Sequence, residues 1–114
     1  MKLTKSLSKN LNQIKQLFNN SPDIVVKEFK CDYLNCAVLY LKGLADVALI
    51  SNFVTRPMQK ATNLPKQNSD RFVVNNIINF PEINPETDFN ELINQITKGK
   101  AVLMFNGVNV AYLI

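Results

Sequence analysis

The apolar run Cys36-Ala37-Val38-Leu39-Tyr40-Leu41 is the feature that most restricts the fold of this 114-residue chain. An unbroken apolar run of this kind is typical of a strand that is buried on both faces. Residues 24–30 before it are β-branched and partly alternate, so the two segments predict a hairpin whose loop covers residues 31–35. Such a sheet needs helices over at least one of its faces.

Three segments are predicted to supply those helices. Over residues 3–18, apolar residues recur at three- and four-residue spacing opposite a face of lysine and glutamine. A second helix is predicted to begin at the N-cap Asp46 and to end just before Pro57, because proline cannot continue a helix. The third begins with a capping box at Asp88 and ends at Gly99, the expected left-handed residue after a helix.

The last part of the chain predicts a second hairpin. Residues 101–105 and 108–114 flank Asn106-Gly107, a pair typical of a two-residue type I′ turn. Residues 71–78 carry short apolar clusters that fit either a strand or a helical turn, and we favour a strand. Residues 60–70 are polar and rich in turn formers, so they predict an exposed loop within the domain.

These elements predict the fold class α/β, in its α+β form, with a mixed sheet built from two β-hairpins and packed with about three helices. A length of 114 residues, 46% of them hydrophobic, suits one compact domain over residues 1–114 and is too short for two. No segment approaches the apolar length that crosses a bilayer, so the chain is expected to be soluble.

Catalysis is not predicted. The chain has no histidine, its glycines are isolated, and its carboxylates have local explanations as turn, cap or surface residues, so we expect no catalytic residue, cofactor or metal. Cys36 is predicted to lie in the core and Cys31 in the hairpin loop. A metal clip or a disulfide between them is the alternative, but zinc would need two further soft ligands. Two cysteines and no visible secretory signal predict a reducing, unexported location.

The formal charge of +4 permits weak attraction to anionic partners without requiring it. Arginine is the residue suited to bidentate contacts with bases and phosphates, and the chain has only Arg56 and Arg71. A sequence-specific nucleic-acid reader is therefore not expected. Weak, non-specific nucleic-acid binding remains an alternative on the basis of the pI of about 9.2.

Several segments resemble the GerA family of spore germination proteins, the A subunits of nutrient germinant receptors. The resemblance is carried by residues 23–29 (DIVVKEF), by residues 37–46 (AVLYLKGLAD), by Arg56-Pro57-Met58, and by the helix from Asp88 followed by residues 101–107 (AVLMFNG). The chain departs from the family pattern at several positions, which are Lys27, Lys42, Ala45, Met58 and Asn106.

This resemblance implies the first part of a soluble N-terminal domain that precedes a membrane-embedded region. It further implies a receptor of the inner spore membrane, with this domain on the spore-core side. The implied partners are the receptor B and C subunits and the remainder of the A subunit, and a homo-oligomer is compatible with the resemblance. The membrane would be reached through regions outside this segment.

The leading functional prediction is a non-enzymatic signalling or assembly domain that couples nutrient sensing to germination. A small-ligand binding module is the first alternative. Loops at strand ends often carry recognition, so the candidate interaction residues are Leu44, Asp46, Lys60, Lys66 and Asp70. The residues expected to fix turns and caps are Gly43, Pro57, Asp88, Gly99, Asn106 and Gly107.

Overall fold

A computed structural model describes all residues from 1 to 114, and its centre is one five-stranded sheet in the order β1-β2-β4-β5-β3. The strands are β1 (Ile24–Cys31), β2 (Leu34–Leu41), β3 (Asn84–Glu86), β4 (Val102–Phe105) and β5 (Ala111–Leu113). The α+β class is confirmed. The sheet is not mixed as predicted, because both hairpins, the β2–β4 pair and the added strand β3 are all antiparallel.

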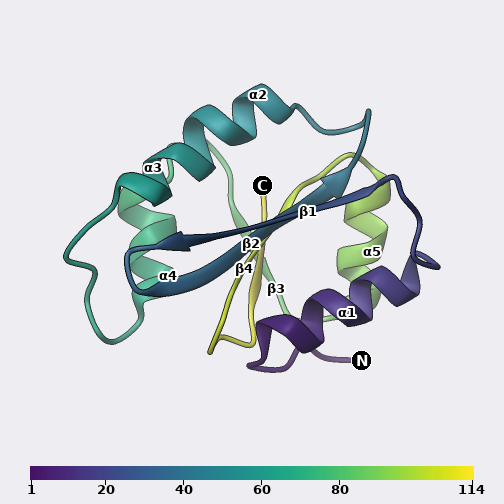
Figure 1. Ribbon diagram of the computed structural model, residues 1–114, viewed down its shortest axis with the longest axis horizontal. Helices are drawn as coiled ribbons and strands as arrows, with labels where there is room; N and C mark the ends of the chain where they lie inside the picture. Colours follow the sequence, from purple (N-terminus) through teal and green to yellow (C-terminus); the bar gives the residue numbers. More distant parts are fainter.

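Helices cover both faces of the sheet (Figure 1). They are α1 (Leu7–Leu17), the continuous run of α2 (Val47–Ile50), η1 (Ser51–Thr55) and α3 (Arg56–Lys60), the run of α4 (Ser69–Phe72) and η2 (Val73–Ile77), and α5 (Phe89–Thr97). The pair α1 and α5 lies on one face, and the other helical runs lie on the opposite face. None of these helices is long and apolar enough to cross a membrane.

Strand β2 is buried on both faces, as predicted. Ala37 and Leu39 pack against α1 and α5, whereas Cys36, Val38 and Tyr40 belong to the core cluster beneath the other helical runs. A central strand with two apolar faces therefore connects two separate cores. The predicted helices over residues 3–18 and from Asp88 are confirmed as α1 and α5, with Leu3 buried just ahead of α1.

The first hairpin is tighter than predicted. Cys31 pairs with Leu34, so the turn consists of Asp32 and Tyr33 alone, and Asp32 adopts a positive φ of 55°. Placing Cys31 in a loop was wrong, because it is the last residue of β1 and is fully buried. Aspartate tolerates the left-handed conformation that such a short turn requires.

The second hairpin is wider than predicted. Residues 106–110 connect β4 to β5, and Asn106 does not have the positive φ that a type I′ turn demands. The reason lies in contacts outside the hairpin. The amide of Asn106 donates to the Asn35 carbonyl at 2.8 Å, and the amide of Gly107 donates to the Lys5 carbonyl at 2.8 Å. These bonds hold the loop against the neighbouring hairpin and the start of α1.

Pro57 does not end the second helix, contrary to prediction. The helical run continues to Lys60 through the wider turn η1, in which the Arg56 amide donates to the Ser51 carbonyl five residues back. Proline cannot donate to the carbonyl four residues earlier, that of Phe53. The Phe53 carbonyl accepts from the Asn79 amide instead, at 3.2 Å, so the backbone group freed by proline remains bonded.

Residues 69–77 are helical, so the predicted strand over 71–78 was wrong. Val73 and Ile78 both point into the core, and the Ile78 amide donates to the Val73 carbonyl at 3.0 Å. A five-residue spacing of inward side chains belongs to the wide turn η2 and matches neither the strand nor the α-helix period. Residues 60–70, which were predicted to form an exposed loop, are only partly exposed, because Leu64 and Ser69 are buried.

Candidate functional site

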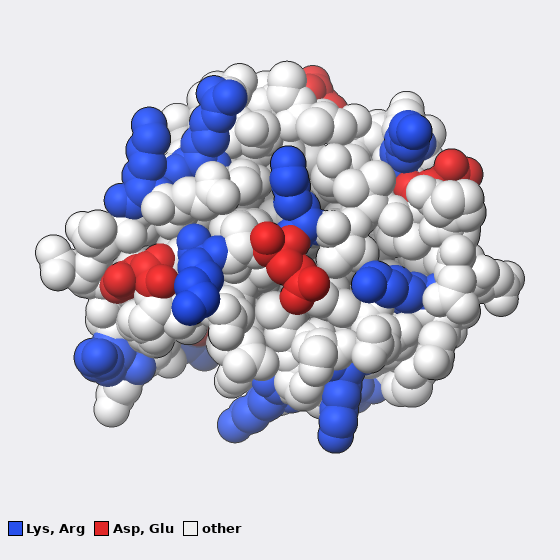
Figure 2. All heavy atoms as spheres, in the orientation of Figure 1, with Lys and Arg blue, Asp and Glu red and all other residues white.

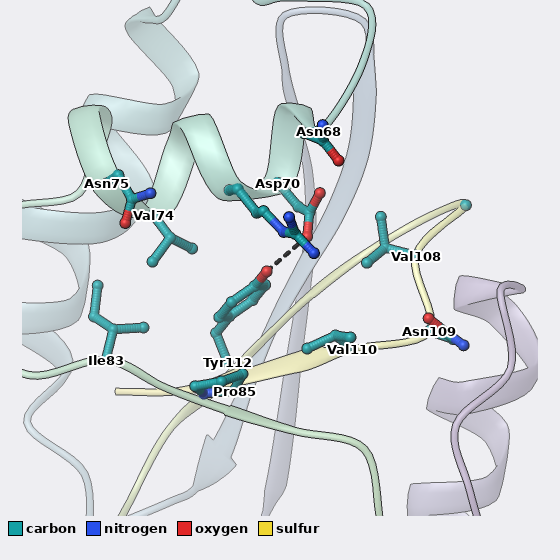
Figure 3. A pocket seen from close by; sticks show the side chains of 12 residues that line it. Asn68, Asp70, Val74, Asn75, Ile83, Pro85, Val108, Asn109, Val110 and Tyr112 are labelled. Atoms are coloured by element: carbon teal, nitrogen blue, oxygen red, sulfur yellow. Dashed lines mark hydrogen bonds between the residues drawn. The ribbon is translucent and has the colours of Figure 1, made fainter.

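A pocket of about 480 Å³ opens between the run α4–η2 and the β4–β5 hairpin (Figure 3). Its apolar wall includes Val74, Ile83 and Val110, and polar side chains such as Asn75 and Asn109 stand around it. Pockets for small organic ligands commonly have volumes of several hundred Å³ and combine apolar walls with a few polar groups. The size and lining of this pocket fall within that description.

The Tyr112 hydroxyl lies within this pocket and donates a hydrogen bond to Asp70 Oδ2 at 2.6 Å (Figure 3). The Tyr112 ring packs edge-on against Phe105, with ring centroids 6.0 Å apart. Burial, followed by the bond to Asp70, raises the pKa of the Tyr112 phenol, so the hydroxyl stays protonated as a donor. Arg71 lines the same pocket, which therefore presents a carboxylate and a guanidinium on adjacent residues.

The loop that leads into α4 is attached to the first hairpin by side-chain hydrogen bonds. Tyr33 donates to the Pro65 carbonyl at 2.7 Å, and its hydroxyl lies 2.8 Å from Ser69 Oγ. Asp32 Oδ2 accepts from the Leu64 amide at 3.2 Å. The two turn residues of the first hairpin thus position the start of α4, and with it one side of the pocket.

The five predicted interaction residues do not form one site. Asp70 lines the pocket, and the ammonium of Lys66 lies 5.3 Å from the centre of the Tyr33 ring. Lys60 is the last residue of α3, at the same end of the sheet. Leu44 and Asp46 lie in the turn after β2, at the opposite end of that strand (Figure 1).

A smaller hollow of about 160 Å³ lies beneath α2, where the chain reaches Ile114. Leu49 and Phe80 line it together with Ile114. Phe53 follows on the same helical run and contacts Phe80 edge-on, with ring centroids 6.4 Å apart. Leu49 is 44% exposed and Phe53 is 38% exposed, so this apolar ridge faces outward.

The residues predicted to fix turns and caps mostly do so. Asp46 Oδ1 accepts from the Leu49 amide, Asp88 Oδ2 accepts from the Glu91 amide, and the three glycines all have positive φ. Asp88 Oδ1 also accepts from the Met1 ammonium at 3.2 Å, and this bond is the largest cause of a pKa below the ordinary value for that carboxyl. Asn106 Oδ1 accepts from the Leu7 amide, an interaction between elements distant in sequence.

The two thiols are part of the core. Burial raises the pKa of Cys31 to about 11, with the charge of Asp32 adding to the effect, and burial raises that of Cys36 to about 12. Both cysteines are free, and no cluster of three or more His, Cys, Asp or Glu side chains is placed to hold a metal ion. Neither position has the low pKa and exposure of a reactive thiolate.

On the face shown in Figure 2, lysines and arginines lie at several separate places, in some places side by side, and acidic side chains lie beside several of them. A nucleic-acid interface is expected to show a continuous basic patch or stripe. This face offers none.

Tyr112, Tyr33 and Phe53 are the site residues that sequence reasoning missed. Tyr112 lies in an apolar run that reads as buried strand, and nothing in its neighbours indicates that its hydroxyl finds a partner 42 positions earlier. Phe53 lies with Leu49, Ile50 and Val54 in the apolar stripe of the second helix that the sequence predicts. Ile50 and Val54 of that stripe are buried, whereas Phe53 is 38% exposed.

Comparison with known proteins places these features in a family. The family model of the Bacillus/Clostridium GerA spore germination protein matches residues 12–114. Spore germination protein KA of Bacillus subtilis (strain 168) is 21% identical over 114 residues, which is 97% of this chain and 21% of that protein. Spore germination protein GerLA of Bacillus cereus is 22% identical over 116 residues, covering 100% of this chain and 24% of that protein. The chain thus spans about a fifth to a quarter of the length of these curated relatives.

A solved structure has the same fold. It is the crystal structure of the N-terminal domain of the A subunit of the Bacillus megaterium spore germinant receptor GerK3, with a TM-score of 0.85 and 26% sequence identity. The match covers 100% of this chain and 47% of that one. This agreement, with a family match over nine-tenths of the sequence, confirms the resemblance drawn from the motifs. The chain belongs to the GerA family of spore germination proteins and corresponds to part of the N-terminal domain of a germinant receptor A subunit.

Proposed function

We propose that this chain is a non-enzymatic assembly and signalling domain that couples nutrient sensing to spore germination. Its family and its match to an A-subunit N-terminal domain support this role. The proposed partners are the B and C subunits of the receptor and the remainder of the A subunit. The proposed location is the spore-core side of the inner spore membrane.

The uses of the carboxylates support a non-catalytic role. Acid–base catalysis commonly needs carboxyl groups that converge on a substrate cleft. Here Asp46 caps α2, Asp32 holds the Leu64 amide, and Asp70 accepts from Tyr112. Each of these carboxylates is occupied by a bond that stabilises the fold.

The observation that carries the assembly role is the exposed apolar surface of the run α2–η1. Leu49 is 44% exposed and Phe53 is 38% exposed, and both lie beside Phe80, which lines a hollow with Leu49 and contacts the Phe53 ring edge-on. Scattered apolar side chains are normal on a surface, whereas a contiguous set indicates contact with another protein surface. We therefore place the assembly contacts of the domain here.

Co-purification of the receptor tests this proposal. In the intact receptor, Leu49→Asp is expected to reduce the amount of A subunit recovered with its partner subunits from spore membranes, because a charge replaces an apolar contact. Leu17→Asp is the matched control, since Leu17 is similarly exposed (39%) but lies on the opposite face of the sheet at the end of α1. Equal recovery for the two variants would contradict the proposal.

Small-ligand binding is the second candidate function, and the pocket beside Tyr112 is the observation that favours it. Its volume of about 480 Å³ and its combination of apolar wall and charged groups suit a small polar molecule. Addition of a mixture of amino acids and simple sugars should then shift the backbone amide resonances of residues 70–75 and 108–112. Loss of those shifts in Asp70→Asn would confirm the site, whereas unchanged spectra of the parent chain would reject it.

A further inference from the structure

The net positive charge of the chain is concentrated in α1 and the residues that lead into it. Residues 1–22 carry four lysines and no acidic residue, whereas the nine other basic residues of the chain are matched by nine acidic ones. The whole net charge of +4 therefore lies in this segment. Charges on a protein surface act over about 8 Å at physiological salt, so an anion is attracted mainly to this part of the domain.

A hollow of about 380 Å³ lies beside α1, in this same positive segment. One face of the helix and the residues before it form the lining, and Phe89 is the only lining residue from elsewhere in the chain. Residues three, four and seven positions apart share one face of a helix. The side chains that this arrangement brings to the hollow are Lys9, Asn12, Gln13 and Gln16 from α1, with Lys2 and Thr4 from the residues before it. No carboxylate lines the hollow.

Asn10 fixes the shape of the hollow. Its side chain is only 1% exposed, accepts a hydrogen bond from the Thr4 amide at 2.9 Å and donates one to the Thr4 carbonyl at 2.8 Å. The residues before α1 are also held from their other side, because the Leu3 amide donates to the Thr87 carbonyl at 2.9 Å. A hollow that is already formed lowers the entropy cost of binding a ligand.

The α1 side of the hollow presents hydrogen-bond donors that have no partner within the chain. Lys9 is exposed and has no carboxylate partner, because the one ion pair of the chain joins the Met1 ammonium to Asp88. The side-chain amides of Gln13 and Gln16 likewise take part in no hydrogen bond within the chain. The charge of Asp88, which precedes the lining residue Phe89, is offset by the Met1 ammonium.

This lining favours an anion with several acceptor oxygens. An apolar ligand would contact only two apolar residues, Met1 and Phe89, and a cation would find no carboxylate. Lysine is a common partner of phosphate, to which it contributes a point charge, and neutral amides add hydrogen bonds to the phosphate oxygens. We propose that the hollow beside α1 binds a phosphate group, with Lys2 and Lys9 balancing its charge.

The phosphate group has two possible sources, a lipid headgroup or a soluble phosphate. Lysines near a membrane draw a protein to anionic lipids, and this segment carries four of them. A nucleic acid fits the hollow poorly, because no arginine lines it and its aromatic residue, Phe89, is only 2% exposed and cannot stack on a base. This inference goes beyond the proposed function and does not depend on it, because α1 and the run α2–η1 lie on opposite faces of the sheet (Figure 1).

Titration with inorganic phosphate at constant ionic strength tests the site. The backbone amide resonances of residues 2–16 should shift and saturate, and Lys9→Gln should weaken this binding about tenfold, because one charge-assisted contact is lost. Lys15→Gln is the matched control, since it removes the same unit of charge from the same helix but does not line the hollow. The control should bind phosphate as the parent chain does.

Sedimentation with lipid vesicles distinguishes the two sources. Binding to phosphatidylglycerol vesicles that is absent with phosphatidylcholine, is lost in Lys9→Gln and is retained in Lys15→Gln would identify the lipid headgroup as the source. Saturable binding of inorganic phosphate without vesicle binding, with the same dependence on Lys9, would identify a soluble phosphate.

Two results would overturn the inference. In the first, neither inorganic phosphate nor phosphatidylglycerol vesicles bind the parent chain. In the second, Lys9→Gln and Lys15→Gln weaken binding equally, which would mean that the anion responds to overall charge and not to the hollow. Gln13→Glu provides an independent check, because it places a carboxylate in the hollow and should abolish binding of either ligand.

Discussion

The hydrogen bond from Tyr112 to Asp70 is the only side-chain hydrogen bond that joins the helical segment 69–77 to strand β5. It spans 2.6 Å across the pocket and connects residues 42 positions apart in sequence. One side of the pocket is thus held to β5 by a single side-chain hydrogen bond, whereas Tyr33 and Asp32 hold the start of α4 to the first hairpin. A ligand that competed for Asp70 would loosen this connection, which gives the pocket a physical route to a change of conformation.

Tyr112→Phe is expected to lower the free energy of unfolding by about 1 to 3 kcal/mol, because the substitution leaves a partly buried carboxylate without its donor. Urea denaturation measures the change. Tyr40→Phe is the matched control, since Tyr40 is equally buried (8% against 7%) and its hydroxyl donates no hydrogen bond within the chain. A loss in Tyr40→Phe as large as that in Tyr112→Phe would show that the bond to Asp70 contributes nothing specific.

Stability is expected to fall at alkaline pH. Folding raises the pKa of Cys31 to about 11 and that of Cys36 to about 12, and it also raises the pKa of Tyr112. The folded state therefore holds these protons more tightly than the unfolded state. The contribution of these protonated groups to the free energy of unfolding is complete below pH about 8 and is lost as the pH rises through 11 and 12. Urea midpoints at pH 7.5, 9 and 10.5 should decrease in that order. A constant midpoint would contradict the burial of these groups.

Gly99→Ala is expected to destabilise the chain more than Gly43→Ala. Both glycines have positive φ, of 97° and 87°, where an L residue costs about 1 to 2 kcal/mol. A Cβ at position 99 would also lie 3.3 Å from the Leu44 carbonyl oxygen, whereas one at position 43 meets nothing within 4 Å. Both variants carry the strain of a positive φ, so the difference between their melting temperatures measures the effect of the contact with the Leu44 carbonyl oxygen. Equal melting temperatures would show that the turn at Leu44 shifts without cost to accommodate the added Cβ.

Asp46→Ala is expected to cost about 1 kcal/mol of stability by removing the N-cap of α2, whereas Asp46→Asn should retain most of it, because asparagine also caps well. Asp46→Ala removes the hydrogen bond that the Leu49 amide donates to Asp46 Oδ1 at 3.1 Å. Because the α2 ridge is the proposed assembly surface, Asp46→Ala should also weaken receptor recovery. Equal stability of the two variants would mean that the carboxylate does not act as a cap.

The parts of the fold that follow from local physics were predicted from the sequence. Residues close together in sequence were enough to predict three elements. These are the strand around Val38 with two apolar faces, the amphipathic helix around Leu11 and the helix start at the capping box of Asp88. Tertiary contacts decided the rest. The Asn79 amide satisfies the carbonyl that Pro57 leaves free, and the Asn106 and Gly107 amides bond to the Asn35 and Lys5 carbonyls, outside the hairpin.

The candidate site was predicted only in part, for a related reason. Asp70 was chosen because it lies in a polar segment, and that reasoning could not find Tyr112, whose apolar neighbours predict a buried strand. Leu44 and Asp46 were chosen from the turn after β2, and the exposed ridge continues from there to Phe53. Phe53 belongs to the same apolar stripe as the buried Ile50 and Val54, so the sequence pattern alone does not show that Phe53 is exposed.

The rate of nutrient-triggered germination tests the central claim most directly. Spores whose receptor carries Leu49→Asp or Phe53→Asp should germinate more slowly with their nutrient than parent spores, while Leu17→Asp spores should match the parent. Such a result would link the exposed ridge of this domain to signalling in the assembled receptor. Parental germination rates in all three variants, with normal amounts of the A subunit, would contradict the account.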